Sequence, residues 1–426
     1  MTGELKVVVK DVVYPGKALT KREDGKAVFV DEGIDGEELL VRIVREHKTY
    51  DEATLIKVLS PSHHRVEPMC SHYRTCSNYQ VMNYDYQIRI KLRQLANMMK
   101  GIYTQRIYSL LPDNKFYYRN KVTFHLDWER CVFGYRNLWG EVIDVDTCHL
   151  LMPVLNRVWK TIKDGLTKID PHHRIVSDIT LRANRLGEVL VLLYVNSPTQ
   201  EISEDWIELS CSDKAVVGVV RIRGESVENV WGRDWLEEVI GGKTYRFHSS
   251  AFFQVNYEMV EKFLPLLKKE VIEEDSRIVL DLFCGVGLLG LSLSDVVRWI
   301  YGVEKDSVCG KSLAVNADYA GFGNFSYKIA SSSNVVWEIF ENSALKKKID
   351  SVIVDPPRRG LSKSVREFLR KNSKVKRVYY LSCDPMTLRR DLLHLKSVYK
   401  VKRMYFLDFF PQTYHVETFA VLLRRR

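Results

Sequence analysis

Three side chains able to do covalent chemistry stand near the C-terminal end of this sequence, each next to an apolar run. Cys383 lies in YLSCDP, Asp355 in VDPPRRG and Glu417 in HVETFAVLL. A thiolate is a strong nucleophile, and carboxylates act as general bases or as hydrogen-bond acceptors. Such a set suits a reaction that passes through a covalent intermediate and requires the removal of one proton.

Methylation of a pyrimidine ring is a reaction that uses all three groups. Carbon 5 of uracil is a poor nucleophile, but addition of a thiolate to carbon 6 creates an enolate whose carbon 5 attacks an electrophilic methyl group. We expect Cys383 to be this nucleophile. The carbon-5 proton must then leave before the thiolate is expelled, and Glu417 is the expected base. Asp355 is expected to hold the polar edge of the ring.

A single cysteine is more often a small buried apolar residue than a nucleophile. We expect Cys284 and Cys309 to be of that ordinary kind. Cys383 differs because Ser382 and Asp384 give it polar neighbours at the end of an apolar run. This flank favours a catalytic role for its thiol.

The segment from about residue 248 to 426 must position these groups. In it, apolar runs such as RIVLDLF, WIYGVE, DSVIVDPP and RVYYLSC alternate with amphipathic segments. This alternation predicts strands joined by helices in a doubly wound parallel sheet, an α/β Rossmann-like domain. Ligands of such sheets bind beyond the carboxyl ends of the strands, where the three motifs fall.

A glycine turn follows the first of these strands. Gly285 and Gly287 in DLFCGVGLL permit a tight turn that opens a helix, and Glu304 ends the next strand, where a carboxylate can accept both hydroxyls of a ribose. Dinucleotides and S-adenosylmethionine share this ribose recognition. The later motifs DPPRRG and LSCDP suit group transfer to a base better than hydride transfer, which favours S-adenosylmethionine.

Two further regions precede this domain. Residues 1–60 contain short β-branched runs separated by turns, which predicts a small closed β-barrel. Residues 61–247 mix strand-like and helix-like segments, which predicts an α+β central domain. In FYYRNKVTF and RCVFGYRNLW aromatic residues alternate with basic ones, a composition suited to single-stranded RNA.

Composition limits the class of protein. The 426 residues include 64 Lys and Arg against 54 Asp and Glu, a net charge of +10, which favours an anionic partner although many soluble proteins are basic. The N-terminus has no signal-peptide pattern, and VLVLLYV is too short to span a membrane. We therefore expect a cytoplasmic monomer without membrane association, whose eight cysteines are not paired in disulfides.

Taken together, DLFCGVGLLG, VDPPRRGL, YLSCDPMTLRRDL and FFPQTYHVETFAVLLRR resemble the RNA 5-methyluridine (uracil-C5) methyltransferases, and the resemblance extends over nearly the whole chain. It implies S-adenosylmethionine as methyl donor, Cys383 as nucleophile and Glu417 as base. It implies a cofactor site made by Gln254, Phe283, Glu304 and Asp355 beside the glycine turn. It also places Arg358, of the DPPR motif, and Arg136 near the RNA substrate.

The resemblance also bears on the substrate. GIDGEELLVRI and PSHHRVEP are similar to the TRAM-type, OB-like RNA-binding barrel often fused to these enzymes. Because the transfer RNA branch often lacks this barrel, 23S ribosomal RNA is the expected substrate. The alternatives are a transfer RNA enzyme and an RNA-binding protein with an inactive methyltransferase domain. Cytosine-C5 methylation is less favoured, because the RNA cytosine enzymes carry cysteines in two motifs and DPPRRG has none.

The sequence departs from the family pattern at three sites. Ser331 stands after the third strand of the Rossmann-like domain, where family members usually have an acidic or amide residue that recognises adenine. Leu288 stands where family members commonly have asparagine after the glycine turn. Many members bind a [4Fe-4S] cluster through four cysteines; Cys70, Cys76 and Cys148 match three of them, but Tyr79 occupies the remaining position. Three thiolates with an outside ligand would hold a cluster, and a domain that packs without iron would keep them as relics. The sequence leaves both readings open.

Overall fold

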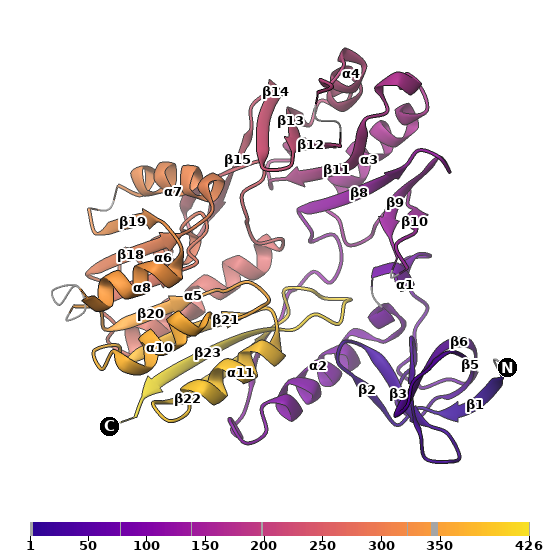
Figure 1. Cartoon of the computed structure of the whole chain (residues 1–426), viewed down its shortest axis with the longest axis horizontal. Coiled ribbons are helices and arrows are strands. Elements are labelled where there is room, and N and C mark those ends of the chain that lie inside the picture. The colour runs from indigo at the N-terminus through magenta and orange to yellow at the C-terminus, as the bar shows by residue number, and fades with distance from the viewer. Residues whose placement is uncertain are drawn as a thin grey trace. The chain divides into compact units, whose positions relative to one another are not determined.

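The computed structural model describes residues 3–76, 78–137, 139–196, 199–321, 323–341 and 348–425 (Figure 1). The chain forms two compact units, Met1–Lys100 with Phe410–Val416, and Gly101–Phe409 with Glu417–Arg426. The three-domain division at residues 60 and 247 stays a prediction. No helix in the described part of the chain is long and apolar enough to cross a membrane.

The first unit begins with a six-stranded sheet in the order β1-β5-β6-β4-β3-β2. β1 pairs with β5 at one edge of the sheet, and β2 pairs with β3 at the other edge. Because β1 and β2 follow each other directly along the chain, their short connection joins the two edges and the sheet curls round. Its alternating buried side chains, among them Val7, Val28 and Val41, fill the interior. This confirms the strand-rich N-terminal barrel. The strands are β1 (Glu4–Val8), β2 (Asp11–Val13), β3 (Lys17–Lys21), β4 (Ala27–Val30), β5 (Glu38–Glu46) and β6 (Tyr50–Ser60).

Three helical segments complete the first unit. They are α1 (Tyr73–Cys76), the 3-10 helix η1 (Asn78–Val81) and α2 (Tyr84–Met98). Asn83 caps α2 by accepting a hydrogen bond from the backbone N–H of Tyr86. A second apolar cluster forms here around Tyr79 and Ile90.

The second unit contains a seven-stranded sheet in the order β10-β9-β8-β11-β12-β13-β14. Two helices, α3 and α4, pack on β11 and β13 (Figure 1). Their Trp159 and Trp206 are fully buried in the core with Phe124. The apolar run VLVLLYV, too short to span a membrane, forms β12, which lies inside this sheet. The elements are β8 (Lys121–Asp127), β9 (Val132–Arg136), β10 (Val142–Asp144), α3 (Pro153–Leu166), η2 (Pro171–His173), β11 (Val176–Ala183), β12 (Val189–Val195), α4 (Glu204–Cys211), β13 (Val216–Arg223) and β14 (Ser226–Gly232).

A two-stranded hairpin of β15 (Trp235–Ile240) and β16 (Lys243–His248) leads into an eight-stranded sheet in the order β19-β18-β17-β20-β21-β23-β22-β7. β17 to β21 run parallel, and β23 enters antiparallel between β21 and β22. This confirms the Rossmann-like α/β fold. The strands are β7 (Tyr108–Leu110), β17 (Ile278–Leu282), β18 (Trp299–Glu304), β19 (Phe325–Ile329), β20 (Ser351–Val354), β21 (Arg377–Ser382), β22 (Tyr399–Leu407) and β23 (Glu417–Arg424).

Helices connect the parallel strands. α8 packs beside α10, and α10 beside α11, as Figure 1 shows. Ser362 and Asp384 cap α10 and α11 through their side-chain oxygens, which fixes where the chain leaves the strands and turns. The helices are α5 (Tyr257–Glu273), α6 (Leu288–Ser292), α7 (Ser307–Ala320), α8 (Ser332–Glu341), α10 (Lys363–Lys371) and α11 (Pro385–Leu395).

Candidate active site

The predicted reactive residues meet at the carboxyl ends of the parallel strands. Asp355 directly follows β20, and Cys383 directly follows β21. The strand order reverses between β17 and β20, because β18 and β19 lie on one side of β17 and the later strands on the other. Such a reversal opens a crevice above the sheet where ligands bind.

The antiparallel pairing of β21 with β23 brings Cys383 and Glu417 together. Ser382 is the register partner of Thr418. Cys383 directly follows Ser382 and Glu417 directly precedes Thr418, and the charge of Glu417 acts on the pKa of the Cys383 thiol. The nucleophile and base expected from the sequence are therefore neighbours.

All three reactive groups are partly or wholly desolvated. Burial raises the pKa of the Glu417 carboxyl well above its usual range, and Asp355 adds to this effect. Burial also raises the pKa of Asp355 to about 7. Burial, Glu417 and Asp355 raise the pKa of the Cys383 thiol to about 12, while Arg358 acts in the opposite direction. The thiol and the Glu417 carboxyl therefore hold their protons at neutral pH.

A pocket with an empty volume of about 370 Å³ lies beside these groups. Four of the residues expected to bind the cofactor line it, namely Gln254, Phe283, Gly285 and Asp355. The Gln254 amide donates a hydrogen bond to a carboxylate oxygen of Asp355 at 3.4 Å. Four cofactor residues that sequence reasoning drew from separate motifs thus line one cavity, whereas Gly287 and Glu304 are not among its lining residues.

The turn at the mouth of this pocket has a left-handed backbone. Phe283, Gly285 and Gly287 have φ angles of +64°, +56° and +89°. At Gly287 an added Cβ would lie 2.7 Å from Leu313, so glycine is required by packing as well as by conformation. Leu288, at the family asparagine position, also lines the pocket with an apolar side chain.

Glu304 is the last residue of β18, and its carboxylate is hydrogen-bonded to the glycine turn that follows the neighbouring strand β17. One carboxylate oxygen accepts a hydrogen bond from the backbone N–H of Gly285 at 2.9 Å, and the other accepts from those of Lys305 and Asp306. These bonds fix the carboxylate beside the glycine turn, where the sequence predicted a ribose acceptor.

Comparison with known proteins now decides the family. The family model described as tRNA (Uracil-5-)-methyltransferase matches residues 83–426. The chain belongs to this family. It is an RNA (uracil-C5-)-methyltransferase that uses S-adenosylmethionine.

Similar proteins extend over nearly the whole length of this methyltransferase. An uncharacterized RNA methyltransferase of Aquifex aeolicus is 33% identical over 98% of this chain and 98% of its own. The 23S rRNA (uracil(1939)-C(5))-methyltransferase RlmD of a Marinomonas species is 29% identical over 95% of this chain and 92% of its own. The fold matches the crystal structure of Pyrococcus abyssi tRNA (uracil-54, C5)-methyltransferase bound to S-adenosyl-L-homocysteine, with a TM-score of 0.78, 22% identity and coverage of 98% and 100%.

The remaining predicted residues lie on the surface of the methyltransferase. Arg136 ends β9 and Arg358 follows β20 in the DPPR loop, and both are exposed. Neither lines the cofactor pocket. Their contacts with RNA stay predictions.

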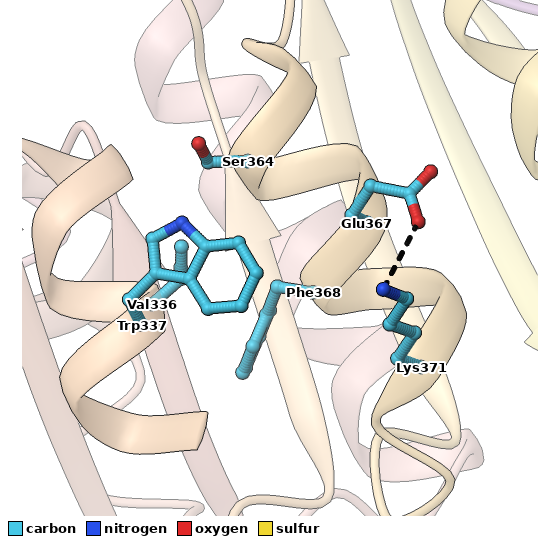
Figure 2. Close-up of a pocket in the computed structure, with 6 residues that line it drawn as sticks. All are labelled: Val336, Trp337, Ser364, Glu367, Phe368 and Lys371. Atoms are coloured by element: carbon cyan, nitrogen blue, oxygen red, sulfur yellow. Dashed lines mark ion pairs between the residues drawn. The ribbon is translucent and has the colours of Figure 1, made fainter. Parts of the chain in front are cut away.

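A second pocket lies away from these groups, between α8 and α10 (Figure 2). Trp337 of α8 faces Phe368 of α10 across it, and an ion pair of 3.8 Å joins Glu367 to Lys371 at its side. Its empty volume is about 180 Å³, and it contains none of the predicted site residues. The pocket at the glycine turn stays the candidate cofactor site, because four of the predicted cofactor residues line it.

The residues at the family's cluster-ligand positions are not a suitable set of ligands for an iron–sulfur cluster. The described residues contain no group of three or more His, Cys, Asp or Glu side chains that could hold a metal. Tyr79 is fully buried in the apolar cluster, and its hydroxyl is hydrogen-bonded to the Gln94 side chain. A [4Fe-4S] cluster usually takes four thiolates, so Cys70, Cys76 and Cys148 with this phenol do not fit it. No step of the reaction is assigned to such a cluster.

Asp281, which sequence reasoning missed, is a buried acid within β17. One carboxyl oxygen accepts a hydrogen bond from the backbone N–H of Gly290 at 2.9 Å, and burial raises the pKa of the group to about 8. An aspartate inside an otherwise apolar strand was the available signal. Its neutral carboxyl ties the strand to α6 beneath the cofactor turn.

Protonation of Asp281 makes stability depend on pH. Between an unfolded pKa of about 4 and the folded value near 8, the native state keeps a proton that the unfolded chain has lost. The free energy of unfolding therefore falls as pH rises through this interval, by up to about 1.4 kcal/mol per pH unit for one carboxyl. Asp281→Asn should reduce this slope, because an amide does not titrate. The substitution should leave the local structure intact, because the amide oxygen still accepts the hydrogen bond from Gly290. Urea unfolding at pH 5, 6, 7 and 8 measures the free energy of unfolding of both proteins. Equal slopes of this free energy against pH would contradict the protonated state assigned to Asp281.

Proposed function

We propose that this enzyme methylates carbon 5 of a uridine in 23S ribosomal RNA through a transient bond between Cys383 and carbon 6. The observation that carries the proposal is the pairing of β21 with β23, which brings Cys383 and Glu417 together, while Asp355, which lines the pocket, acts on the pKa of both. A nucleophile and a base placed in this way can act on the same ring.

Each residue then has a defined task. Gln254, Phe283, Gly285 and Glu304 hold the methyl donor, and Asp355 accepts a hydrogen bond from the polar edge of the uracil. Cys383 and Glu417 first lose their protons to solvent, because only a thiolate adds to carbon 6 and only a carboxylate accepts the carbon-5 proton. The Cys383 thiolate bonds to carbon 6, and the enolate formed takes the methyl group at carbon 5, which breaks the bond from that group to the donor sulfur and leaves S-adenosylhomocysteine. Glu417 removes the carbon-5 proton, and the electron pair of that bond expels the thiolate. Because burial raises the pKa of Glu417, its ionised form is a strong base.

One feature favours ribosomal over transfer RNA. The RlmD relative acts on 23S rRNA by its name, and its similarity covers 95% of this chain. The N-terminal barrel does not decide between the two substrates, because the match to the Pyrococcus abyssi tRNA enzyme covers 98% of this chain and so includes the barrel. The name of the family and the Pyrococcus abyssi enzyme favour transfer RNA as the second candidate. A cytoplasmic, monomeric state stays a prediction.

Methyl transfer to unmodified transcripts tests the substrate. The enzyme is incubated with tritiated S-adenosylmethionine and either full-length 23S rRNA or a set of tRNAs, all made by transcription in vitro. We expect label in 23S rRNA at one or a few uridines, with tRNA at least tenfold lower. Label confined to tRNA would overturn the ribosomal assignment and leave the chemistry intact.

A further inference from the structure

Strands β8 and β11 of the seven-stranded sheet carry polar side chains on the face opposite α3 and α4. Along β8, Val122, Phe124 and Leu126 belong to the buried core. Side chains alternate along a strand, so Lys121, Thr123 and His125 lie on the other face. On β11 the register partners of Lys121 and Thr123 are Arg182 and Thr180, which continue this face across the sheet.

Arg136 shares the polar face with Lys121. The register of β8 with β9 pairs His125 with Gly134. Arg136 stands two residues beyond Gly134 and therefore points to the same side. The arginine expected near RNA and Lys121 thus lie on one face, which also carries the ion pair of His125 with Asp178.

The Lys121 end of this face is joined to the cofactor segment. Asn120, its chain neighbour, donates a side-chain hydrogen bond to the backbone carbonyl of Gln254 at 2.9 Å. The Arg182 guanidinium donates to the carbonyls of His248, Ser249 and Ala251, just before Gln254. The polar face therefore runs from Arg136 to the segment that lines the pocket.

Lys121 is the available cation at this end. Arg182 is 1% exposed, and its guanidinium lies over the Phe247 ring at 4.2 Å, so it cannot reach an outside ligand. Lys121 is half-buried, and within the described residues its ammonium has neither a hydrogen-bond nor an ion-pair partner. Burial and the charge of Arg182 lower its pKa to about 8. An anion bound here would relieve the repulsion between these two cations.

We propose that Lys121 binds a backbone phosphate of the RNA next to the flipped uridine. This inference rests on the proposed RNA uridine substrate and adds a contact to it. Phosphate is the anion that RNA brings to the surface marked by Arg136, and lysine binds it as a point charge. The carboxylate of the methyl donor is the other anion at hand, but Lys121 does not line the cofactor pocket.

Lys121→Met tests the contact, with Lys160→Met as the matched control. Lys160 is exposed on α3, the helix that packs on the opposite face of the same sheet. The affinity for the methylated RNA fragment is measured at several KCl concentrations, and that for S-adenosylhomocysteine by calorimetry. We expect Lys121→Met to weaken RNA binding about tenfold and to reduce the salt slope by about one, with cofactor affinity unchanged.

Each other outcome has a definite meaning. Lys160→Met should change neither quantity, and Lys121→Arg should restore most of the RNA affinity because it keeps the charge. Loss of S-adenosylhomocysteine binding instead would assign Lys121 to the cofactor carboxylate and overturn the inference. Unchanged RNA affinity and salt slope in a folded Lys121→Met protein would also overturn it. Failure of the wild-type enzyme to bind or methylate any RNA would refute the proposed function itself.

Discussion

Replacing Cys383 with alanine abolishes methyl transfer, with turnover reduced by at least about 10⁴-fold, while the affinity for S-adenosylhomocysteine stays within about twofold. Without the thiol, carbon 5 of the uracil is never activated, whereas the cofactor pocket is lined by other residues. The measurement uses RNA that contains 5-fluorouridine. Fluorine cannot leave as a proton, so the wild-type enzyme stalls as a covalent adduct that survives a denaturing gel.

A second cysteine provides the control for this experiment. Cys211 ends α4, packed against the other sheet, and Cys211→Ala should form the adduct as the wild-type enzyme does. If Cys383→Ala still formed the adduct, another residue would be the nucleophile. The proposed mechanism would then be wrong even if the substrate were correct.

Replacing Glu417 with glutamine traps the reaction one step later. The amide has the size of the carboxyl but cannot accept the carbon-5 proton, so the methylated ring stays bonded to Cys383. We expect turnover to fall by about 10³-fold and the covalent adduct to accumulate with ordinary uridine RNA, which contains no fluorine. A denaturing gel detects the adduct, and mass spectrometry of the Cys383 peptide shows a nucleotide that carries the transferred methyl group.

Glu270→Gln is the matched control for this variant. Glu270 is another fully buried glutamate of the same unit, bonded to Arg403 on β22. Its replacement should lower stability without trapping an adduct. A Glu417→Gln enzyme that turned over normally, or that failed to form any adduct, would remove Glu417 from the role of base.

Local sequence was sufficient to locate the strand ends. Asp355 and Cys383 follow apolar runs directly, and an apolar run bounded by a turn is a signal that needs no distant partner. The buried state of Cys284 and Cys309 is also confirmed, with 7% and 4% exposure. These predictions depended only on neighbours along the chain.

Pairing between distant segments was not predictable in the same way. The motifs suggested that Glu417 acts with Cys383, but only the register of β21 with β23 makes them neighbours. The desolvation of Asp281 and the placement of Arg182 beside Lys121 likewise depend on which strands lie side by side. A sequence pattern gives the face of a strand, whereas its partner is set by packing of the whole sheet.

The strand β7 has a consequence for any attempt to divide this enzyme. Residues 108–110 precede the seven-stranded sheet in the chain, yet they pair in parallel with β22 at the margin of the catalytic sheet. A recombinant fragment that started at residue 248 would retain every reactive group and still lack this covering strand. Its bare margin would offer unpaired amides to other copies, so such a truncation invites self-association.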